Sequence, residues 1–243
     1  MTTTAPEQIA RTLGRTAERC RFGPPVHHVY NPLVYAFEAH RKYLRRYCQR
    51  EADILLLGMN PGPFGMVQTG VPFGEVTAVT DWLGIREGVE PPENQHPRRP
   101  VEGFRCVRRE ISGQRLWGWA KDRYRTPDAF FRRFFIWNYC PLAFLEETGR
   151  NRTPDKLPAQ ERKPLYDACD RALVEIVDYL QPKLVLGVGQ FGEARARKAL
   201  SAGDIRIGHI LHPSPASPAA NRGWVQQVEK QLADLGVAFP KLS

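Results

Sequence analysis

The sequence lacks the patterns that identify several common classes of protein. Its five cysteines are scattered and form no CxxC pair, which argues against structural zinc and against an iron–sulfur cluster. No apolar run approaches the length of a membrane-spanning helix, and the first residues do not resemble a secretory signal. We therefore expect an intracellular protein with reduced thiols and no membrane partner, in the cytoplasm or nucleoid of a bacterium or the nucleus of a eukaryote.

Motifs of several familiar active sites are missing as well. The glycine-rich segment 58–65 is not followed by Gly-Lys-Ser/Thr, so it is not a phosphate-binding P-loop. The serine nucleophile elbow G-x-S-x-G does not occur. No histidine outside the segment near residue 212 has a partner at metal-ligand spacing, so we expect neither a metal nor a cofactor. Five histidines are accordingly interpreted as surface or hydrogen-bonded side chains: His27, His28, His40, His96 and His209.

Acidic residues are few relative to basic ones. Lys and Arg number 35 against 26 Asp and Glu, which gives a net charge of +9 and a pI near 9.5. This excess favours a polyanionic partner, because neutralising phosphates supplies affinity that does not depend on base sequence. Simple solubility is the alternative explanation. With 243 residues, 42% of them hydrophobic, the chain is long enough for one domain with a sizeable core.

Four apolar runs of strand length occur in the sequence, at residues 54–58, 134–138, 184–188 and 205–211. Helical patterns separate them, and the clearest covers residues 162–180. Strands that alternate with helices indicate an α/β protein with right-handed crossovers. We predict a single domain over residues 21–243, with a four-stranded parallel sheet flanked by helices. Residues 1–20 are polar and are expected to form a flexible arm or a loosely held helix.

One motif points to a nucleotide cofactor. Residues 187–192 match the dinucleotide fingerprint G-x-G-x-x-G and lie between a strand and a helix. However, the motif follows the third predicted strand instead of the first, and the next strand ends at His212 instead of at an acid for a ribose hydroxyl. We therefore favour a tight strand-to-helix packing turn over a nucleotide-cofactor enzyme.

Basic and aromatic residues alternate in two predicted helices, a combination that can contact DNA. In the segment near residue 117 we assign Trp117 and Trp119 to the core. In the helix that begins near residue 34 we favour a solvated face over phosphate contacts for four basic residues: Arg41, Lys42, Arg45 and Arg46.

Polar side chains follow three of the four predicted strands. Asn60 lies after the first strand, Asn138 ends the second and His212 follows the fourth. Ligands of open α/β sheets bind beyond the carboxyl ends of the strands, so these three side chains should meet. Two amides and an imidazole without a carboxylate pair are poorly suited to general acid–base hydrolysis. They can hold a heterocycle by its hydrogen-bonding edge, place a water molecule and stabilise negative charge on a leaving group.

Four motifs carry a resemblance to a known family. They are GMNPGP at residues 58–63, VPFGE at 71–75, NYCPL at 138–142 and HPSP at 212–215. In residues and order they are similar to the motifs of the single-strand-selective monofunctional uracil-DNA glycosylases (SMUG), a branch of the uracil-DNA glycosylase superfamily. The resemblance extends from about Tyr30 to the last predicted helix. It implies a four-stranded parallel sheet between helices, in agreement with the strands predicted above.

The resemblance also implies an activity. A monofunctional DNA glycosylase of this kind hydrolyses the N-glycosidic bond of uracil in single- and double-stranded DNA by base flipping and leaves an abasic site for base excision repair. Asn60 would position the attacking water, and His212 would hydrogen-bond uracil O2 and stabilise the departing anion. Asn138 would pair with the O4/N3 edge, and Phe73 would stack on the base. No lysine is placed for Schiff-base chemistry, so we expect no strand cleavage.

The C5 side of the pocket decides which bases are accepted. By the resemblance, Met59, Gly62 and Met66 would close this side, where family members accept 5-hydroxymethyluracil yet reject thymine. A superfamily glycosylase tuned to another deaminated base, such as xanthine or hypoxanthine, stays an alternative. So does a domain that binds nucleic acid without catalysis.

Two segments resemble the DNA-intruding elements of the family. One begins near Gly113, with Arg115 and Lys121 as candidate phosphate contacts. The other follows His212, where vertebrate members carry Arg-Asn and this chain has smaller, uncharged residues. These residues would support the emptied base stack of a duplex less firmly. This implies a stronger preference for single-stranded DNA, in which flipping a base costs less. We expect a monomer whose partner is DNA, with five candidate DNA-binding residues in this second segment: Pro213, Ser214, Pro215, Ala216 and Ser217.

Overall fold

The computed structural model describes residues 4–50 and 52–240, and its larger sheet is parallel. The strand order is β3–β2–β6–β7. The central strand β2 pairs in parallel with β3 and β6, and Gly58 at its end lies beside Asn138. The predicted four-stranded parallel sheet is confirmed, with strands at Ile54–Gly58 (β2), Phe134–Asn138 (β3), Leu184–Val188 (β6) and Arg206–Ile210 (β7).

The burial of these strands follows from their sequences. Every residue of β2, β3 and β6 is buried, as expected for apolar runs covered on both faces. Strand β7 lies at one edge of the sheet, reads RIGHI and is only partly buried, whereas β3 at the other edge reads FFIWN and is fully buried. The polar residues of β7 face outward, which is one way in which an edge strand avoids pairing with another chain.

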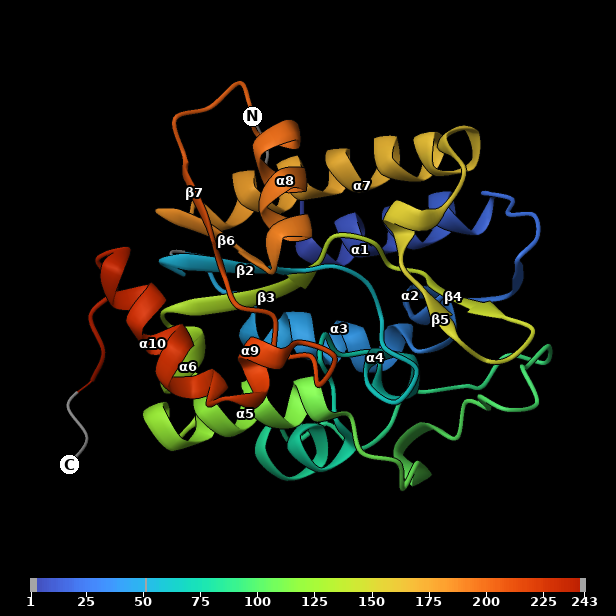
Figure 1. Ribbon diagram of the computed structural model, residues 1–243, viewed down its shortest axis with the longest axis horizontal. Coiled ribbons are helices and arrows are strands. Elements are labelled where there is room, and N and C mark those ends of the chain that lie inside the picture. The colour runs from blue at the N-terminus through green and yellow to red at the C-terminus, as the bar shows by residue number, and fades with distance from the viewer. Residues whose placement is uncertain (1–3, 51, 241–243) are drawn as a thin grey trace.

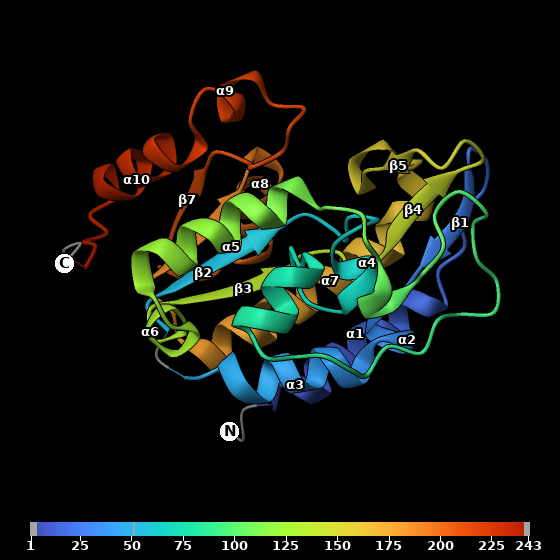
Figure 2. The same ribbon diagram turned by 90° about the horizontal axis from the view of Figure 1, so that it is seen from below.

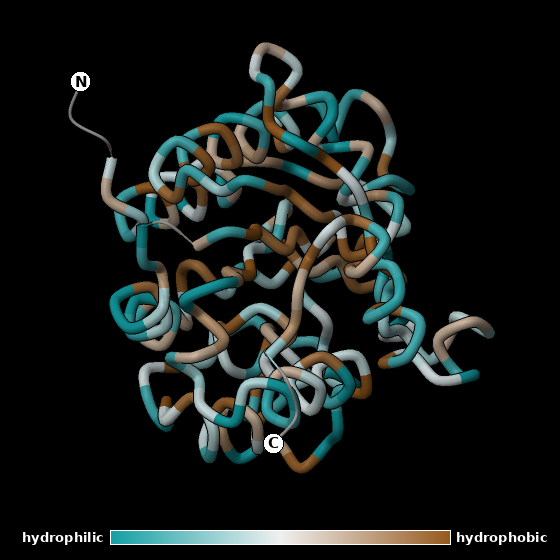
Figure 3. Tube along the Cα trace, turned by 90° about the vertical axis from the view of Figure 1, so that its left-hand side faces the viewer, coloured by the Kyte–Doolittle hydropathy of each residue, from teal (hydrophilic) through white to brown (hydrophobic). Residues whose placement is uncertain are grey.

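Helices cover both faces of the parallel sheet (Figures 1 and 2). On one side lie α7 (Ala159–Leu180) and α8 (Gln190–Ala199). On the other side lie α5 (Ile111–Tyr124), α6 (Pro127–Phe131) and α10 (Trp224–Asp234). Figure 3 shows hydrophobic residues along the strands in the middle of the molecule, with hydrophilic stretches on the outer turns and loops. The layered α/β architecture predicted from the alternating elements is thus present.

The interior beside α5 is aromatic. Trp117 and Trp119 are only 1% and 2% exposed, so their assignment to the core is confirmed. Trp119 meets Phe130 and Phe134 edge to face, with ring centroids 6.0 and 5.7 Å apart. Such pairs add about 0.5–1.5 kcal/mol beyond the burial of their area. This packing holds α5 against the sheet and so positions the loop that precedes the helix.

Helix α1 (Pro6–Glu18) is an integral part of the domain. Ile9, Leu13 and Ala17 recur every fourth residue and are almost fully buried in the side that packs on α7. Burying a side chain such as Ile9 or Leu13 contributes about 1.5–3 kcal/mol. Of the two expectations for residues 1–20, a flexible arm or a loosely held helix, the structure has a helix, and this helix is tightly packed; residues 1–3 lie outside the described residues.

A second, antiparallel sheet is not evident in the sequence. Its order is β1–β4–β5, formed by Val26–Tyr30, Ala143–Glu146 and Asn151–Arg152. Figures 1 and 2 place it beyond the carboxyl ends of the parallel strands. Strand β1 contains two adjacent histidines and β5 has two residues, so neither shows the apolar alternation that predicts a strand.

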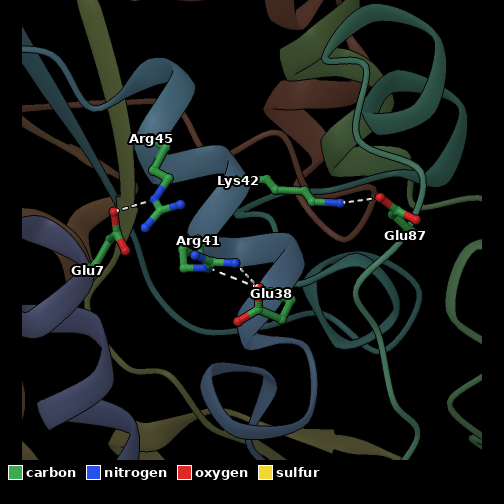
Figure 4. Close-up of polar contacts among 6 residues, drawn as sticks. All are labelled: Glu7, Glu38, Arg41, Lys42, Arg45 and Glu87. Atoms are coloured by element: carbon green, nitrogen blue, oxygen red, sulfur yellow. Dashed lines mark hydrogen bonds and ion pairs between the residues drawn. The ribbon is translucent and has the colours of Figure 1, made fainter.

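The basic residues of α3 (Phe37–Tyr47), which follows α2 (Pro32–Tyr35), are held by local contacts. Arg46 donates to the carbonyl of Gly84 at 2.7 Å. These contacts support a solvated helix face, and exposed ion pairs of this kind contribute at most about 1 kcal/mol each. Three ion pairs are visible in Figure 4: Arg41 with Glu38, Lys42 with Glu87, and Arg45 with Glu7.

The remaining elements are short. Gly223, with φ +100°, separates α9 from α10 at the end of the chain. Among the described residues, none of the helices is both long and apolar enough to cross a membrane. The short elements are α4 (Met66–Thr69), α9 (Pro218–Asn221), a π-helical turn (Ala78–Trp82) and two 3-10 turns (Gly103–Arg105 and Pro154–Lys156).

Candidate active site

A cavity of about 380 Å³ opens at the carboxyl ends of the parallel strands. It unites the three polar side chains that the sequence places after strands, namely Asn60, Asn138 and His212. The predicted meeting of these groups is therefore observed. Twelve other residues line the cavity: Met59, Gly62, Pro63, Gly65, Met66, Phe73, Glu110, Ser112, Asn151, Thr153, Ser214 and Pro215.

Asn60 has an orientation that its neighbours determine. Its Nδ2 donates a hydrogen bond to the carbonyl of Leu142 at 3.1 Å. A carbonyl only accepts hydrogen bonds, so the amide nitrogen must face Leu142. The Oδ1 atom is left as an acceptor at the partly exposed end of the cavity. Asn60 can therefore accept a hydrogen bond from a water molecule, whereas an amide cannot take the proton of that water.

His212 is held as a neutral imidazole. The backbone N–H of Ser214 donates to its Nδ1 at 3.1 Å, so the ring proton of the neutral form is on Nε2. Burial lowers the pKa of His212 from its ordinary value of 6.5 to about 4. At neutral pH the side chain is thus an uncharged donor, with Nε2–H as the group available to a ligand.

The fingerprint-like segment 187–192 packs tightly and lies against His212. A Cβ at Gly187 would lie 2.1 Å from the backbone nitrogen of Glu193, and one at Gly192 would lie 2.5 Å from the carbonyl of Leu57. Gly189 has φ +92° and lies against the imidazole, where a Cβ would come within 3.3 Å of the Cβ of His212. The geometry agrees with the packing turn and adds a role in positioning the histidine.

Asn138 and Phe73 share the space above Gly58. A Cβ at Gly58 would meet Asn138 Oδ1 at 2.2 Å and the Phe73 ring at 2.8 Å, so only glycine fits at the end of β2. Asn138 is 7% exposed, and its Nδ2 contacts the Sδ of Met66 at 3.2 Å. A thioether is a weak acceptor, so a better acceptor on a ligand would readily replace it.

Phe73 is held in a conformation that bulky residues rarely adopt. Its φ is +53°, in the left-handed region that favours glycine. The surrounding loop holds it there: Trp117 Nε1 donates to the Phe73 carbonyl at 3.0 Å. A Cβ at Gly113 would lie 2.1 Å from the same carbonyl oxygen, so the first turn of α5 packs directly on Phe73. Local strain of this kind persists where it orients a functional side chain.

The wall formed by Met59, Gly62 and Met66 is rigid because a buried glutamine joins it to a distant loop. Gln68 donates to the carbonyls of Pro63 and Pro100 at 2.9 and 3.0 Å. Its Oε1 accepts two backbone N–H groups at 2.8 and 3.1 Å. All of the amide's principal hydrogen-bonding groups are used, so the loop after β2 has little freedom to change the size of the cavity.

Glu110 lines the cavity although it belongs to none of the four motifs. Its carboxylate caps α5 by accepting the N–H groups of Ser112 and Gly113. Burial raises the pKa of Glu110, and those two backbone donors oppose the rise. The side-chain stem packs against Gly65, whose Cβ position lies 3.0 Å from Glu110 Cγ. An acid at the N-cap position, immediately before the predicted helix, is the signal that could have revealed it.

Asn151 and Thr153 also line the cavity. They follow from the second sheet, since Asn151 begins β5 and β5 pairs with β4. No strand or motif in the sequence marks this segment. Its contribution depends on a pairing between Leu145 and Asn151 that the tertiary structure alone establishes.

The three candidate DNA-binding residues of α5 differ in exposure and in contacts. Gly113 is buried under Phe73, so it is a packing residue and is not exposed for direct contact. Arg115 donates to the carbonyl of Pro213 at 3.0 Å and to Oδ1 of Asn221 at 2.8 Å. Its guanidinium therefore braces the loop after β7. Lys121 is exposed and lines a second groove of about 650 Å³ together with Arg108 and Arg109.

The loop of residues 213–217 projects beside the cavity. Pro213 is buried, whereas Pro215 and Ala216 are exposed. Asn221 Nδ2 donates to the carbonyl of Pro215 at 2.8 Å, and the Ser217 hydroxyl accepts the N–H of Ala220 as the cap of α9. Arg115 and Asn221 thus form a brace for this loop, which leaves the tip at Ala216 free to meet a partner.

Comparisons with known proteins agree with this site. Residues 45–235 match the family model of the uracil DNA glycosylase superfamily, so the chain belongs to that superfamily. The single-strand selective monofunctional uracil-DNA glycosylase of Rattus norvegicus is 48% identical over 227 residues, which cover 93% of this chain and 82% of the relative. The corresponding protein of Bos taurus is 50% identical over 211 residues, 86% of this chain and 78% of the relative. Within the superfamily, the chain therefore belongs to the single-strand selective monofunctional branch.

A solved structure supports the fold independently. The crystal structure of wild-type Pedobacter heparinus SMUG2 aligns with a TM-score of 0.68 at 17% sequence identity, over 97% of this chain and 98% of that one. At this identity the likeness concerns the fold. The resemblance noted from the four motifs, and the DNA glycosylase class that it implies, are confirmed by the family model and the curated relatives.

Proposed function

We propose that this protein is a monofunctional uracil-DNA glycosylase, which hydrolyses the bond between uracil and deoxyribose and leaves an abasic site for base excision repair. One observation carries the proposal. A single cavity contains an amide oxygen free to hold water (Asn60), a neutral imidazole N–H (His212) and a buried amide beside an aromatic face (Asn138 with Phe73). These are the groups that such a reaction requires, and no metal or cofactor is needed for it.

The first step on duplex DNA is base flipping, because a base inside the stack cannot enter the cavity. The flipped uracil lies on the ring of Phe73. The Nδ2 of Asn138 donates to O4 in place of its weak contact with Met66, and Oδ1 accepts from N3–H. Since both side chains are packed over Gly58, the site is formed before the base enters. Little reorganisation is then required on binding.

Bond cleavage leaves a positive oxocarbenium-like sugar and a negative uracil. His212 Nε2–H donates to O2, where the charge develops, and the hydrogen bond strengthens as the anion forms. Asn60 Oδ1 holds the water that adds to C1′. The proton of that water leaves after attack on the cation, so a strong general base is unnecessary.

Substrate choice is set at the C5 side. The wall of Met59, Gly62 and Met66 is fixed through Gln68, so a substituent at C5 must fit the existing space. We include 5-hydroxymethyluracil among the substrates, because its hydroxyl can replace an ordered water near this wall. The methyl group of thymine offers no hydrogen bond in exchange for such a water, which disfavours it. Both single- and double-stranded DNA are substrates. Among the described residues no lysine lines the cavity, so we expect no Schiff base and no strand cleavage.

The proposal is tested by incubating the protein with single-stranded oligonucleotides that contain uracil, 5-hydroxymethyluracil, xanthine, hypoxanthine or thymine. Free base and alkali-labile sites are then measured. We expect release of uracil and 5-hydroxymethyluracil, no release of thymine, and no strand breaks before alkali treatment. Preferential release of xanthine or hypoxanthine would assign a different base specificity, and binding without any base release would overturn the enzymatic proposal.

A further inference from the structure

Three histidines that are unrelated in sequence spacing meet on the second sheet. His27 and His28 lie on β1, and His96 comes from the loop before α5. In a regular strand, adjacent side chains point to opposite faces. The register of β1 against β4 shifts between Val26 and His28, and this irregularity lets both rings turn to the same side. The three histidines are hydrogen-bonded, which agrees with the sequence-based interpretation, but their spacing in the sequence does not predict that they meet.

The three rings form one compact cluster. Ring centroids lie 4.7 Å apart for His27 and His28, 5.1 Å for His28 and His96, and 6.1 Å for His27 and His96. One nitrogen from each ring lies within 4.8 Å of the others. Three imidazoles at this separation are close to the arrangement of a three-histidine metal site.

The position of His96 is built into the fold. Tyr30, at the end of β1, accepts the backbone N–H of His96 and donates to the carbonyl of Arg99, both at 2.7 Å. His96 is 1% exposed, so its ring has little freedom. The loop that carries it is therefore attached to the same strand that carries the other two histidines.

Two of the rings already present a lone pair toward the cluster. His28 Nε2 faces Oδ1 of Asn94 at 3.1 Å, so this nitrogen carries the proton, and Nδ1 is the acceptor that meets His27 Nδ1. His96 Nε2 faces the carbonyls of Glu146 and Glu147, both at 3.1 Å, which places its lone pair on Nδ1 as well. Metal-binding histidines commonly donate their second N–H to an amide or carbonyl in this way, which sets the tautomer and the ring orientation.

We infer that His27, His28 and His96 bind a divalent late first-row metal ion, for which Zn²⁺ is the reference probe. The ligand atoms are the Nδ1 atoms of His28 and His96 and a ring nitrogen of His27. His27 is exposed, which gives the ion a path of entry and leaves room for water as a further ligand. Imidazole nitrogens suit Zn²⁺, Cu²⁺ and Ni²⁺ and select against Mg²⁺ and Ca²⁺, which prefer oxygen.

Metal entry requires the rings to adjust. The Nδ1 atoms of His27 and His28 are 2.7 Å apart and share one hydrogen bond. Two nitrogens at the zinc–nitrogen distance of a tetrahedral ion lie about 3.3 Å apart, so the rings must separate slightly and lose the shared proton. His96 Nδ1 must also release the N–H of Arg98, which can bond to water because Arg98 is exposed.

The ion would join three segments that are otherwise held by hydrogen bonds. These are β1, the loop that carries His96, and the turn at residues 146–147 that leads to β5. We therefore expect binding to raise the thermal stability of the second sheet. None of the three histidines lines the proposed active-site cavity, so the inference does not depend on the proposed reaction.

The experiment uses the tag-free, full chain after treatment with a chelator. Isothermal titration with Zn²⁺, Ni²⁺ and Mg²⁺ is combined with Co²⁺ absorption spectroscopy and thermal melting. We expect one Zn²⁺ and one Ni²⁺ per chain, no response to Mg²⁺, a higher Tm with Zn²⁺, and cobalt d–d bands without a thiolate charge-transfer band. His28→Ala and the double variant His27→Val/His28→Ala should weaken Zn²⁺ binding at least about 100-fold, and Asn94→Ala about tenfold.

His209→Ala is the matched control, because His209 lies outside the cluster and pairs with Glu193 on another part of the surface. It should leave the affinity for Zn²⁺ unchanged. The melting temperatures of all variants without metal show whether they fold. Absence of Zn²⁺ binding in the wild type, equal binding in the folded double variant, or a thiolate band that identifies cysteine as the ligand would each overturn the inference.

Discussion

The loops after β2 and β7 form opposite sides of one cavity, but they are held in place by different means. The loop after β2 carries Asn60 and is fixed by its own buried groups, chiefly Gln68. The loop after β7 carries His212, is exposed at Pro215 and Ala216, and is braced by Arg115 and Asn221 from other elements. Buried groups therefore position the loop that carries Asn60, whereas a few side chains near the surface position the loop that carries His212.

The largest expected effect is at the water side. Asn60→Ala removes the acceptor that holds the water, and we expect kcat to fall about 100- to 1,000-fold. Asn60→Asp should stay within about tenfold of wild type, because a carboxylate still accepts from water although it loses the bond to Leu142. Single-turnover release of uracil measures both variants. Equal rates for Asn60→Ala and wild type would remove Asn60 from the mechanism.

The next effect tests how His212 is positioned. Gly189→Ala introduces a Cβ within 3.3 Å of His212 Cβ, at a residue with φ +92°. A displacement of the imidazole by a fraction of an ångström should lower kcat about 10- to 100-fold, with a smaller change in KM. Gly203→Ala is the control, since the nearest atom to its Cβ is 3.9 Å away. Similar losses in both variants would indicate general destabilisation, which melting temperatures would reveal.

Removing the side chain of Arg115, which braces the loop after β7, should have a moderate effect on activity. Arg115→Ala removes the hydrogen bonds to Pro213 and Asn221, and we expect about tenfold lower kcat/KM with a largely unchanged salt dependence. Lys121→Ala is the comparison: an exposed phosphate contact affects KM and lowers the salt slope by about one unit. Kinetics at several salt concentrations separate the two roles. A reduced salt slope for Arg115→Ala would show direct contact with phosphate.

A smaller effect is expected at the tip of the same loop. Ala216 is exposed and short, so it gives little support to the stack that a flipped base leaves behind. Ala216→Arg should raise the rate on duplex DNA severalfold and leave the rate on single strands nearly unchanged, because only the duplex has a stack to fill. Parallel assays on matched oligonucleotides measure the ratio. Wild-type rates that are equal on both substrates would contradict the predicted single-strand preference.

The smallest effect concerns pH. The pKa of His212 is about 4 in the folded protein against an ordinary value of 6.5, so His212 stays neutral over the usual working range. We expect no inflection of kcat/KM near pH 6.5. The free energy of unfolding should fall as pH drops from 6.5 to 4, because there the unfolded chain binds a proton that the folded chain does not. An activity inflection near 6.5 that disappears in His212→Gln would show that the histidine titrates in that range.

The predictable parts of the protein are those with a local cause. Strands β2, β3 and β6 are buried on both faces, so their sequences are continuous apolar runs that predict strands. Asn60 and Asn138 are then identified by their positions at the ends of two of these runs. Helix α1 has the periodic apolar residues Ile9, Leu13 and Ala17, yet its polar composition conceals how tightly it packs. The burial of Gly113 could not be predicted either. It lies in a segment that resembles a DNA-intruding element, but it is covered by Phe73 from a loop distant in the sequence.

The sequence by itself determined the α/β class, the parallel sheet, and three of the polar groups of the site, because strand periodicity and strand ends are local properties of the chain. Only the tertiary structure decided that Glu110, Asn151 and Thr153 line the cavity. It also decided that Arg115 braces the loop after β7 and that His27 and His28 meet His96. These contacts join segments that are far apart in the sequence, and their geometry depends on a strand irregularity and on side-chain hydrogen bonds that no local pattern encodes.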